Sequence, residues 1–228
     1  MQQDPALDRP TARATSDGWD AGVDERFVVL EGLDGAGTTT QLECLREALT
    51  AVGKQCVATC EPTDSPVGKL IRAVVAGETP MAPQSLALLF AADRSEHLNA
   101  RPDGVLTSLA RGAIVASDRY LFSSLAYQAL DSPFDYVVQL NRRFLLPRHL
   151  VFLDTPLAVC QQRVARRERR ELFELQGVQH RLRKSYQRVL DYFADGPVAV
   201  HVVDGQGSRE DVFRRIWMIL ESEPILTR

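Results

Sequence analysis

Lysine is scarce in this chain of 228 residues: only Lys54, Lys69 and Lys184 are present, and every other basic residue is an arginine. Acidic residues slightly outnumber basic ones, so the formal net charge is −3. A chain without a basic excess has no electrostatic reason to bind nucleic acid or an anionic membrane, and we expect neither partner. Any cation that contacts an anionic ligand is expected to be an arginine, whose planar guanidinium pairs well with phosphate oxygens.

Metal-binding cysteine patterns are also missing. No C-x-x-C pair, and no histidine at metal-ligand spacing, occurs among the four cysteines Cys44, Cys56, Cys60 and Cys160. Free thiols in a reducing compartment are therefore the favoured interpretation, and we expect a cytoplasmic protein.

Long apolar runs are absent as well. No segment approaches the length of a transmembrane helix, and residues 1–24 lack the apolar stretch of a secretory signal. Because residues 1–24 are rich in polar residues, proline and glycine, we expect them to be a disordered extension. Residues 25–228 are long enough for one well-packed domain.

A glycine-rich segment, Glu31–Gln41, matches most of a phosphate-binding loop. The pattern Gly-x-x-x-x-Gly-Lys-Ser/Thr is met by Gly32, Gly37 and Thr39, whose hydroxyl normally ligates Mg²⁺, but Thr38 stands in the lysine position. The backbone N–H groups of such a turn, with the helix dipole behind them, bind anions. The sequence therefore predicts a phosphate site that lacks its usual cation, with a tight structural turn as the alternative.

The rest of the chain alternates between strand and helix patterns. Strands are expected at 27–30, 55–60, 113–116, 150–153 and 198–203, and helices at 39–51, 66–75, 83–98, 134–146, 156–167, 178–193 and 208–221. This alternation predicts an α/β fold, a three-layer structure with a mostly parallel five-stranded sheet and helices on both faces. In such sheets ligands bind beyond the carboxyl ends of the strands, where we expect Asp34, Glu61, Asp118 and Asp154.

Three further groups of side chains have a chemical and a structural interpretation. Asp118 and Arg119 could organise Mg²⁺ and bind phosphate, or could form a surface ion pair. Phe90 and Arg94, four residues apart on a helix, could stack on a base and bond its edge, although an isolated Phe90 is more often a core residue. An arginine-rich segment could neutralise a triphosphate or form a solvated helix end, and it contains Arg163, Arg166, Arg167, Arg169 and Arg170.

Together these segments resemble the thymidylate kinases, from about Phe27 to the C-terminus. The resemblance is carried by Glu31-Gly-Leu-Asp-Gly-Ala-Gly, Glu61-Pro62, Leu89-Phe-Ala-Ala-Asp-Arg94, Asp118-Arg-Tyr with Ser123-Ser-Leu-Ala-Tyr-Gln128, and Arg181-Leu-Arg-Lys-Ser-Tyr186. It implies the P-loop nucleoside monophosphate kinase fold and transfer of the γ-phosphoryl group of ATP to dTMP, giving dTDP. It also implies Mg²⁺ as cofactor and a homodimer.

The resemblance implies roles for individual residues. The ATP phosphates would be held by Gly32, Gly35, Ala36, Gly37, Thr38, Thr39 and Thr40, and Mg²⁺ by Thr39 and Asp118. The acceptor dTMP would contact Asp34, Glu61, Phe90, Arg94, Arg119, Ser124 and Tyr127. Catalysis would use Asp34, Asp118 and Arg119 together with the lid arginines Arg166, Arg167 and Arg170.

Two departures from the family pattern bear on activity. Thr38 replaces the loop lysine, and Cys60 replaces the arginine that often precedes Glu-Pro. Because a cation at the transferring phosphoryl group can be worth about 10³–10⁵ in rate, we expect an arginine of the lid segment, at about 163–174, to supply it. Two alternatives stay open: a non-catalytic nucleotide sensor with the same fold, and a kinase for another pyrimidine monophosphate.

Overall fold

The computed structural model describes residues 19–20, 22–165, 176–223 and 225 of the chain. These residues contain a five-stranded sheet in the order β2-β3-β1-β4-β5, and every pairing between neighbouring strands is parallel. The strands are β1 (Val23–Gly32), β2 (Cys56–Cys60), β3 (Ile114–Asp118), β4 (Leu146–Asp154) and β5 (Ala199–Asp204). The predicted α/β class is confirmed.

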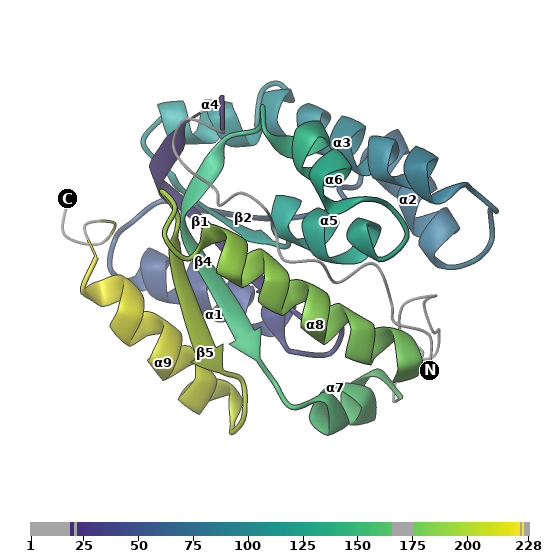
Figure 1. Cartoon of the computed structure of the whole chain (residues 1–228). Coiled ribbons are helices and arrows are strands. Elements are labelled where there is room, and N and C mark those ends of the chain that lie inside the picture. The colour runs from purple at the N-terminus through teal and green to yellow at the C-terminus, as the bar shows by residue number, and fades with distance from the viewer. Residues whose placement is uncertain (1–18, 21, 166–175, 224, 226–228) are drawn as a thin grey trace.

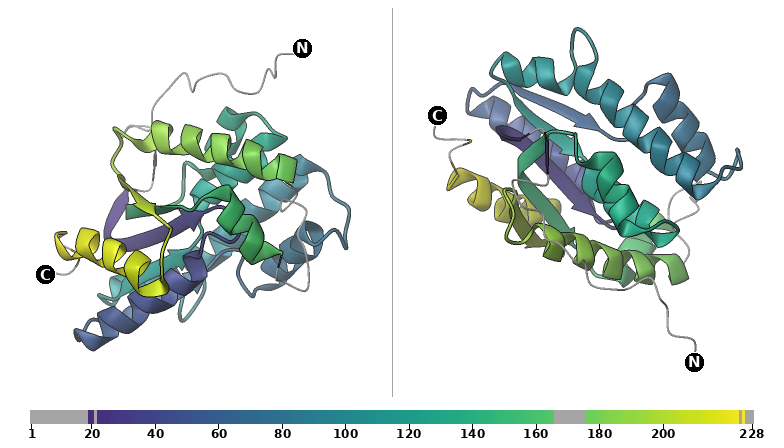
Figure 2. Two further views of the ribbon diagram at one scale, coloured as in Figure 1. Left: turned by 90° about the horizontal axis from the view of Figure 1, so that it is seen from below. Right: turned by 45° about the horizontal axis from the view of Figure 1, so that its top comes forward.

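Helices cover both faces of the sheet (Figure 1). On one face α1 (Thr38–Ala51) packs beside α9 (Arg209–Glu221), and on the other α5 (Leu121–Tyr127) packs against α8 (Gln176–Phe193), as Figure 2 shows. The structure also contains α2 (Pro66–Val75), α3 (Pro83–Asn99), α4 (Val105–Ala110), α6 (Phe134–Asn141), α7 (Leu157–Val164) and a short 3₁₀ helix, η2 (Gln128–Leu130). Among the described residues, no helix combines the length and the apolar character that a membrane span requires.

Burial explains which elements the sequence reveals. The central strands are apolar and covered on both faces, as parallel strands are, so runs such as Phe27–Leu30 are fully buried. Helix α2 has a clear apolar face and is found at its predicted bounds, with Ser65 accepting a hydrogen bond at its N-terminus. By contrast, every residue of α5 is buried, so no polar face marks it as a helix. Neither α5 nor α4 is among the helices that the pattern predicts.

The predicted helix at 134–146 is too long. Helix α6 ends at Asn141, and β4 already begins at Leu146. Phe144 and Leu145 continue the apolar pattern between the two elements, which hides the boundary in the sequence. Pro147 lies within the first residues of β4, next to an irregularity in the register between β1 and β4.

Ordered structure begins before residue 25, where the domain boundary is expected. Strand β1 begins at Val23, which pairs with Leu146. Before it, Trp19 is only 4% exposed and its ring lies 5.4 Å from that of Phe193 on α8. The N–H of Asp20 donates to the carbonyl of Arg142. The folded part therefore begins by residue 19, and the remainder of the predicted extension lies outside the described residues.

Replacing Trp19 by alanine should destabilise the fold by about 3 kcal/mol, because a buried aromatic side chain is lost and a cavity remains beside Phe193. Urea unfolding followed by circular dichroism measures the effect. The matched control is Met218→Ala, since Met218 is 64% exposed and its truncation should change stability by less than about 0.5 kcal/mol. Equal effects of the two substitutions would show that Trp19 is not part of the core.

Candidate active site

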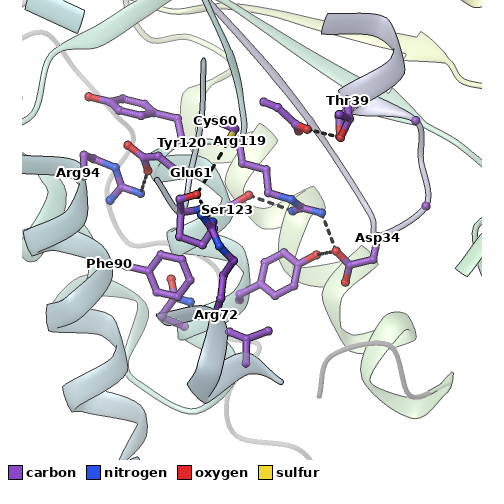
Figure 3. A pocket seen from close by; sticks show the side chains of 18 of the residues that line it. Asp34, Thr39, Cys60, Glu61, Arg72, Phe90, Arg94, Arg119, Tyr120 and Ser123 are labelled. Carbon is purple, nitrogen blue, oxygen red and sulfur yellow. Dashed lines mark hydrogen bonds and ion pairs between the residues drawn. The ribbon is translucent and has the colours of Figure 1, made fainter. Parts of the chain in front are cut away.

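A cavity of about 470 Å³ lies at the carboxyl ends of the central strands, where ligands bind in parallel sheets. Figure 3 shows the side chains that surround it. It is lined by Asp34, Gly35, Gly37, Thr38, Thr39, Thr40, Cys60, Glu61, Pro62, Arg72, Val75, Phe90, Arg94, Asp118, Arg119, Tyr120, Ser123, Tyr127, Gln128 and Arg163. The phosphate loop and most of the predicted acceptor-side residues therefore border one space.

The phosphate loop joins β1 to α1 and depends on two glycines with left-handed backbone. Gly35 has φ +86°, and a Cβ there would lie 2.6 Å from the carbonyl oxygen of Cys160. Gly37, with φ +106°, is the N-cap of α1. Only glycine adopts such angles without strain, and the resulting turn aims backbone N–H groups at the cavity. Two predicted loop residues, Gly32 and Ala36, pack against each other beneath the loop rather than lining the cavity.

Oxygen atoms gather at the start of α1. The hydroxyl of Thr39 donates to Oδ2 of Asp118 at 2.5 Å, which joins the loop to the end of β3 (Figure 3). Oδ1 of Asp118 is buried and has no hydrogen-bond partner among the described residues. A hydroxyl and a carboxylate with a spare oxygen beside a phosphate loop fit the all-oxygen coordination of Mg²⁺.

One arginine reaches the lysine-free loop. Nη1 of Arg163, on α7, donates to the carbonyl oxygens of Gly35 at 3.2 Å and Ala36 at 3.0 Å. The same nitrogen would lie 3.5 Å from a Cβ added at Gly37, so the guanidinium lies against the loop itself. The other predicted lid arginines, Arg166, Arg167 and Arg170, lie outside the described residues.

Arg119 is held by contacts from four sides. Its Nη2 pairs with Asp34 at 2.6 Å, and its Nη1 donates to the hydroxyls of Ser123 and Tyr186, each at 3.1 Å. Its guanidinium also lies 5.2 Å from the ring centre of Tyr127, whose hydroxyl donates to Asp34 at 2.9 Å. Although burial lowers the pKa of Arg119, neighbouring Tyr127, Tyr186 and Asp34 raise it well above its usual value. The side chain is a fixed cation facing the cavity.

The backbone of Arg119 is strained. It is the only described non-glycine residue with positive φ, at 70°. Its N–H donates to the carbonyl of Leu30, and its carbonyl accepts from the hydroxyl of Ser117 at 2.7 Å. These bonds hold a conformation that costs about 1–3 kcal/mol in isolation.

Below this cation lies a buried carboxylate that the sequence does not single out. Glu31 is fully buried in β1 and accepts hydrogen bonds from the N–H groups of Tyr120 and Ser123 and from the hydroxyls of Ser123 and Tyr186. Burial raises its pKa, although the charge of Arg119 and these hydrogen bonds oppose the shift. Glu31 thus orients the two hydroxyls that hold Arg119.

The predicted base-binding residues divide into two groups. Phe90 lines the cavity on α3, facing Val75 and Arg72 of α2. Arg94 also borders it but is fully buried, and its Nη2 donates to Glu61 at 2.6 Å and to Ser124 at 3.1 Å. Its Nη1 donates to Asn141.

Ser124 itself does not line the cavity. The terminal nitrogens of Arg94 therefore bond protein atoms, and Ser124 serves as one of their acceptors.

Two lining residues carry roles that the sequence does not reveal. Arg72 donates to the carbonyl oxygens of Pro62 at 2.5 Å and Thr63 at 2.7 Å, so a half-exposed cation ties α2 to the loop after β2. Cys60, noted only as a departure from a family pattern, also lines the cavity, and burial and the charge of Asp118 raise its pKa. One sequence feature could have identified Arg72: it lies on the helix that comes next after the end of strand β2.

Comparison with known proteins identifies a family. The thymidylate kinase family model matches residues 30–216. A relative from Treponema pallidum (strain Nichols), named "Putative thymidylate kinase", is 43% identical over 72% of this chain and 78% of its own length. A "Probable thymidylate kinase" from Thermococcus gammatolerans is 35% identical over 86% of this chain and 96% of its own length. A third relative, from Aeropyrum pernix, is 36% identical over 79% of this chain and 86% of its own length.

Removing Arg94 should unfold the protein at lower urea concentration, because the buried Glu61 loses its arginine partner and keeps its contact with Nδ1 of His97 at 3.0 Å. We expect Arg94→Met to cost about 3–5 kcal/mol, and Arg94→Met with Glu61→Leu to recover part of that loss. The control is Arg46→Met, which breaks an exposed ion pair with Glu43 and should cost less than about 1 kcal/mol. If Arg94→Met is as harmless as the control, the guanidinium has no structural role.

Proposed function

Because this chain belongs to the thymidylate kinase family, we propose that it transfers the γ-phosphoryl group of ATP to dTMP and releases ADP and dTDP. One observation supports this function beyond family membership. The Arg119–Asp34 ion pair, 2.6 Å long, joins the acceptor side of the cavity directly to the phosphate loop that carries Asp34. A donor phosphate on the loop and an acceptor phosphate at Arg119 would therefore be held next to each other, and proximity supplies much of the catalysis of phosphoryl transfer.

On the donor side, the backbone N–H groups from Gly35 to Thr39 would hold the ATP phosphates. Mg²⁺ bound with ATP supplies charge neutralisation at the phosphates, and Thr39 and Asp118 are the residues that fit it. These two side chains already lie in contact, so the chain needs no rearrangement to present both oxygens on the same side of the loop.

On the acceptor side, Arg119 would bind the phosphate of dTMP, and Phe90 would stack on the base across the cavity. Asp34 would contact the sugar hydroxyl, and Tyr127, bonded to Asp34, would crowd the 2′ position. The acceptor phosphate is itself the nucleophile. Since its second pKa is about 6, it is mostly ionised at neutral pH and needs no general base.

At the base end of the cavity, Glu61, Arg94 and Ser124 form one bonded group. We infer that this group gives the far wall its shape and polarity, and that it contributes to the preference for thymine over other pyrimidines. Nothing in the described structure or in the comparisons favours a non-catalytic sensor. We also propose that the protein acts as a homodimer in the cytoplasm.

The acceptor site is tested by measuring ADP release with dTMP, dUMP and dCMP. We expect dTMP to be the best substrate, and Arg119→Ala to lower kcat/KM by about 10²–10³ because a cation on the acceptor phosphate is lost. Arg111→Ala is the control, since Arg111 is exposed and, in the part of the chain that the structure describes, forms an ion pair only with Asp103. Nucleotide binding without any turnover would instead identify a sensor, and preference for dUMP or dCMP would reassign the acceptor.

We further infer that an arginine between Arg163 and Arg170 replaces the lysine missing at Thr38. The described part of this segment supports the inference, because Arg163 already donates to the loop carbonyls at 3.0 and 3.2 Å. A bound triphosphate would offer the guanidinium stronger, charged acceptors than two carbonyl oxygens. The small change needed is a rotation of the side chain from the carbonyls toward the cavity that it already lines.

Double-mutant cycles, each pairing one arginine substitution with Thr38→Lys, test whether an arginine replaces the missing lysine. Alanine at Arg163, Arg166, Arg167, Arg169 and Arg170, one at a time, should lower kcat by about 10³ at the residue that supplies the charge. The same substitution should cost about tenfold or less in a Thr38→Lys background, because the lysine restores the cation. If all five alanine variants keep their turnover, no arginine of this segment replaces the lysine.

A further inference from the structure

Two histidines and a glutamate meet at the end of the molecule opposite the cavity. His149 lies in β4 and His201 in the neighbouring β5, and Glu223 follows the last turn of α9. One ligand atom from each of the three, a ring nitrogen or a carboxylate oxygen, lies within 4.8 Å of the other two. We propose that these three side chains form a binding site for a divalent transition-metal ion of the zinc class.

The sheet itself places the two histidines together. In the parallel register His149 pairs with Ala199, and Val151 pairs with His201. The histidines are thus two residues out of register, so their side chains project from the same face of the sheet. The rings stack with centres 5.5 Å apart and planes 24° from parallel. The backbone of two adjacent strands fixes this arrangement, which is the kind of rigid support that a metal site requires.

The spacing of the nitrogens fits a shared ion. Nδ1 of His149 lies 3.3 Å from Nε2 of His201. Two nitrogens bound to one tetrahedral zinc at about 2.0–2.1 Å are about 3.3–3.4 Å apart. An N–H···N hydrogen bond between neutral rings explains the same distance, but it gives no role to Glu223.

The tautomer of His149 is compatible with ligation through Nδ1. His149 is fully buried, and its Nε2 has no hydrogen-bond partner among the described residues. No bond at Nε2 therefore fixes the tautomer, and the proton can reside there while Nδ1 keeps the lone pair that a metal needs.

The charges around the cluster permit a cation. Burial lowers the pKa of His201, and the carboxylate of Glu223, which supplies a negative charge to the cluster, opposes that shift. Arg148, whose charge lowers the pKa of both histidines, lies 3.6 Å from Glu25 and donates to the carbonyl of Pro197, so part of its charge is offset there. Two imidazoles and one carboxylate leave one position of a tetrahedral ion open to water, as in zinc sites with three protein ligands.

The site is accessible and separate from the cavity. Strand β5 is at the edge of the sheet, and both His201 and Glu223 are partly exposed. His149 lies five residues before Asp154, the carboxyl end of β4, which is about 16 Å along the strand. A bound ion would tie the end of α9 to β4 and β5 without touching the phosphate loop.

Zinc titration of the full-length, chelator-treated protein tests the site. We expect one equivalent of Zn²⁺ to bind, to raise Tm by several degrees, and to be replaced by Co²⁺ with the visible absorption of a tetrahedral site. His201→Gln and Glu223→Gln should each weaken Zn²⁺ binding by about tenfold or more. Both residues are partly exposed, so these variants avoid the buried His149 and should fold.

His180→Gln is the matched control, because His180 is exposed on α8 and distant in sequence from all three ligands. Cys60→Ser tests for zinc held by the exposed thiol. Circular dichroism and the Mg²⁺-dependent reaction should be unchanged in His201→Gln. Unaltered Zn²⁺ affinity in His201→Gln, loss of binding in Cys60→Ser, or no binding to the unmodified chain each overturns the proposal.

Discussion

The architecture of the cavity depends on one buried carboxylate. Glu31 bonds two backbone N–H groups at the start of α5 and two hydroxyls, and those hydroxyls in turn bond Arg119. Through this single side chain β1 is tied to the β3–α5 connection and to α8. A buried charge is costly unless it is fully hydrogen-bonded. The same requirement that satisfies Glu31 therefore also fixes the orientation of the Arg119 guanidinium, which lines the cavity.

An ordered guanidinium is also central to the proposed role of Arg163 at the lysine-free loop. A lysine in the loop would be a flexible point charge, whereas an arginine brings a planar fork that bonds two acceptors at once. Arg163 already bonds two loop carbonyls, so its guanidinium is ordered before any phosphate arrives. Gly35 permits this approach, because a Cβ at that position would collide with the carbonyl oxygen of Cys160 in α7, the helix that carries Arg163. The glycine at position 35 is thus compatible with an arginine of α7 lying against the loop.

How much of this could be predicted depends on whether a residue's role is local. The phosphate loop, α2 and the parallel sheet follow from spacing and periodicity, and the structure has them as expected. Helix α5 is not predicted from the sequence, because complete burial leaves it without a polar face. The sequence places Trp19 in the extension, because the contact that orders it, with Phe193, joins residues 174 positions apart. The role of Glu31 is not predicted for the same reason, since its partners lie at the start of α5 and in α8.

For Arg94, the family resemblance and the structure indicate different contacts. A family pattern assigns the residue to the base edge, yet its guanidinium is fully buried and bonds Glu61, Ser124 and Asn141. The side chain also borders the cavity, so in the proposed function the ordered guanidinium would form part of its wall. A guanidinium fixed on its far side by a carboxylate loses little entropy when it meets a base. In the proposed function the ion pair with Glu61 would therefore act as preorganisation, since the two charges that pair in the buried interior would also fix the wall of the acceptor pocket.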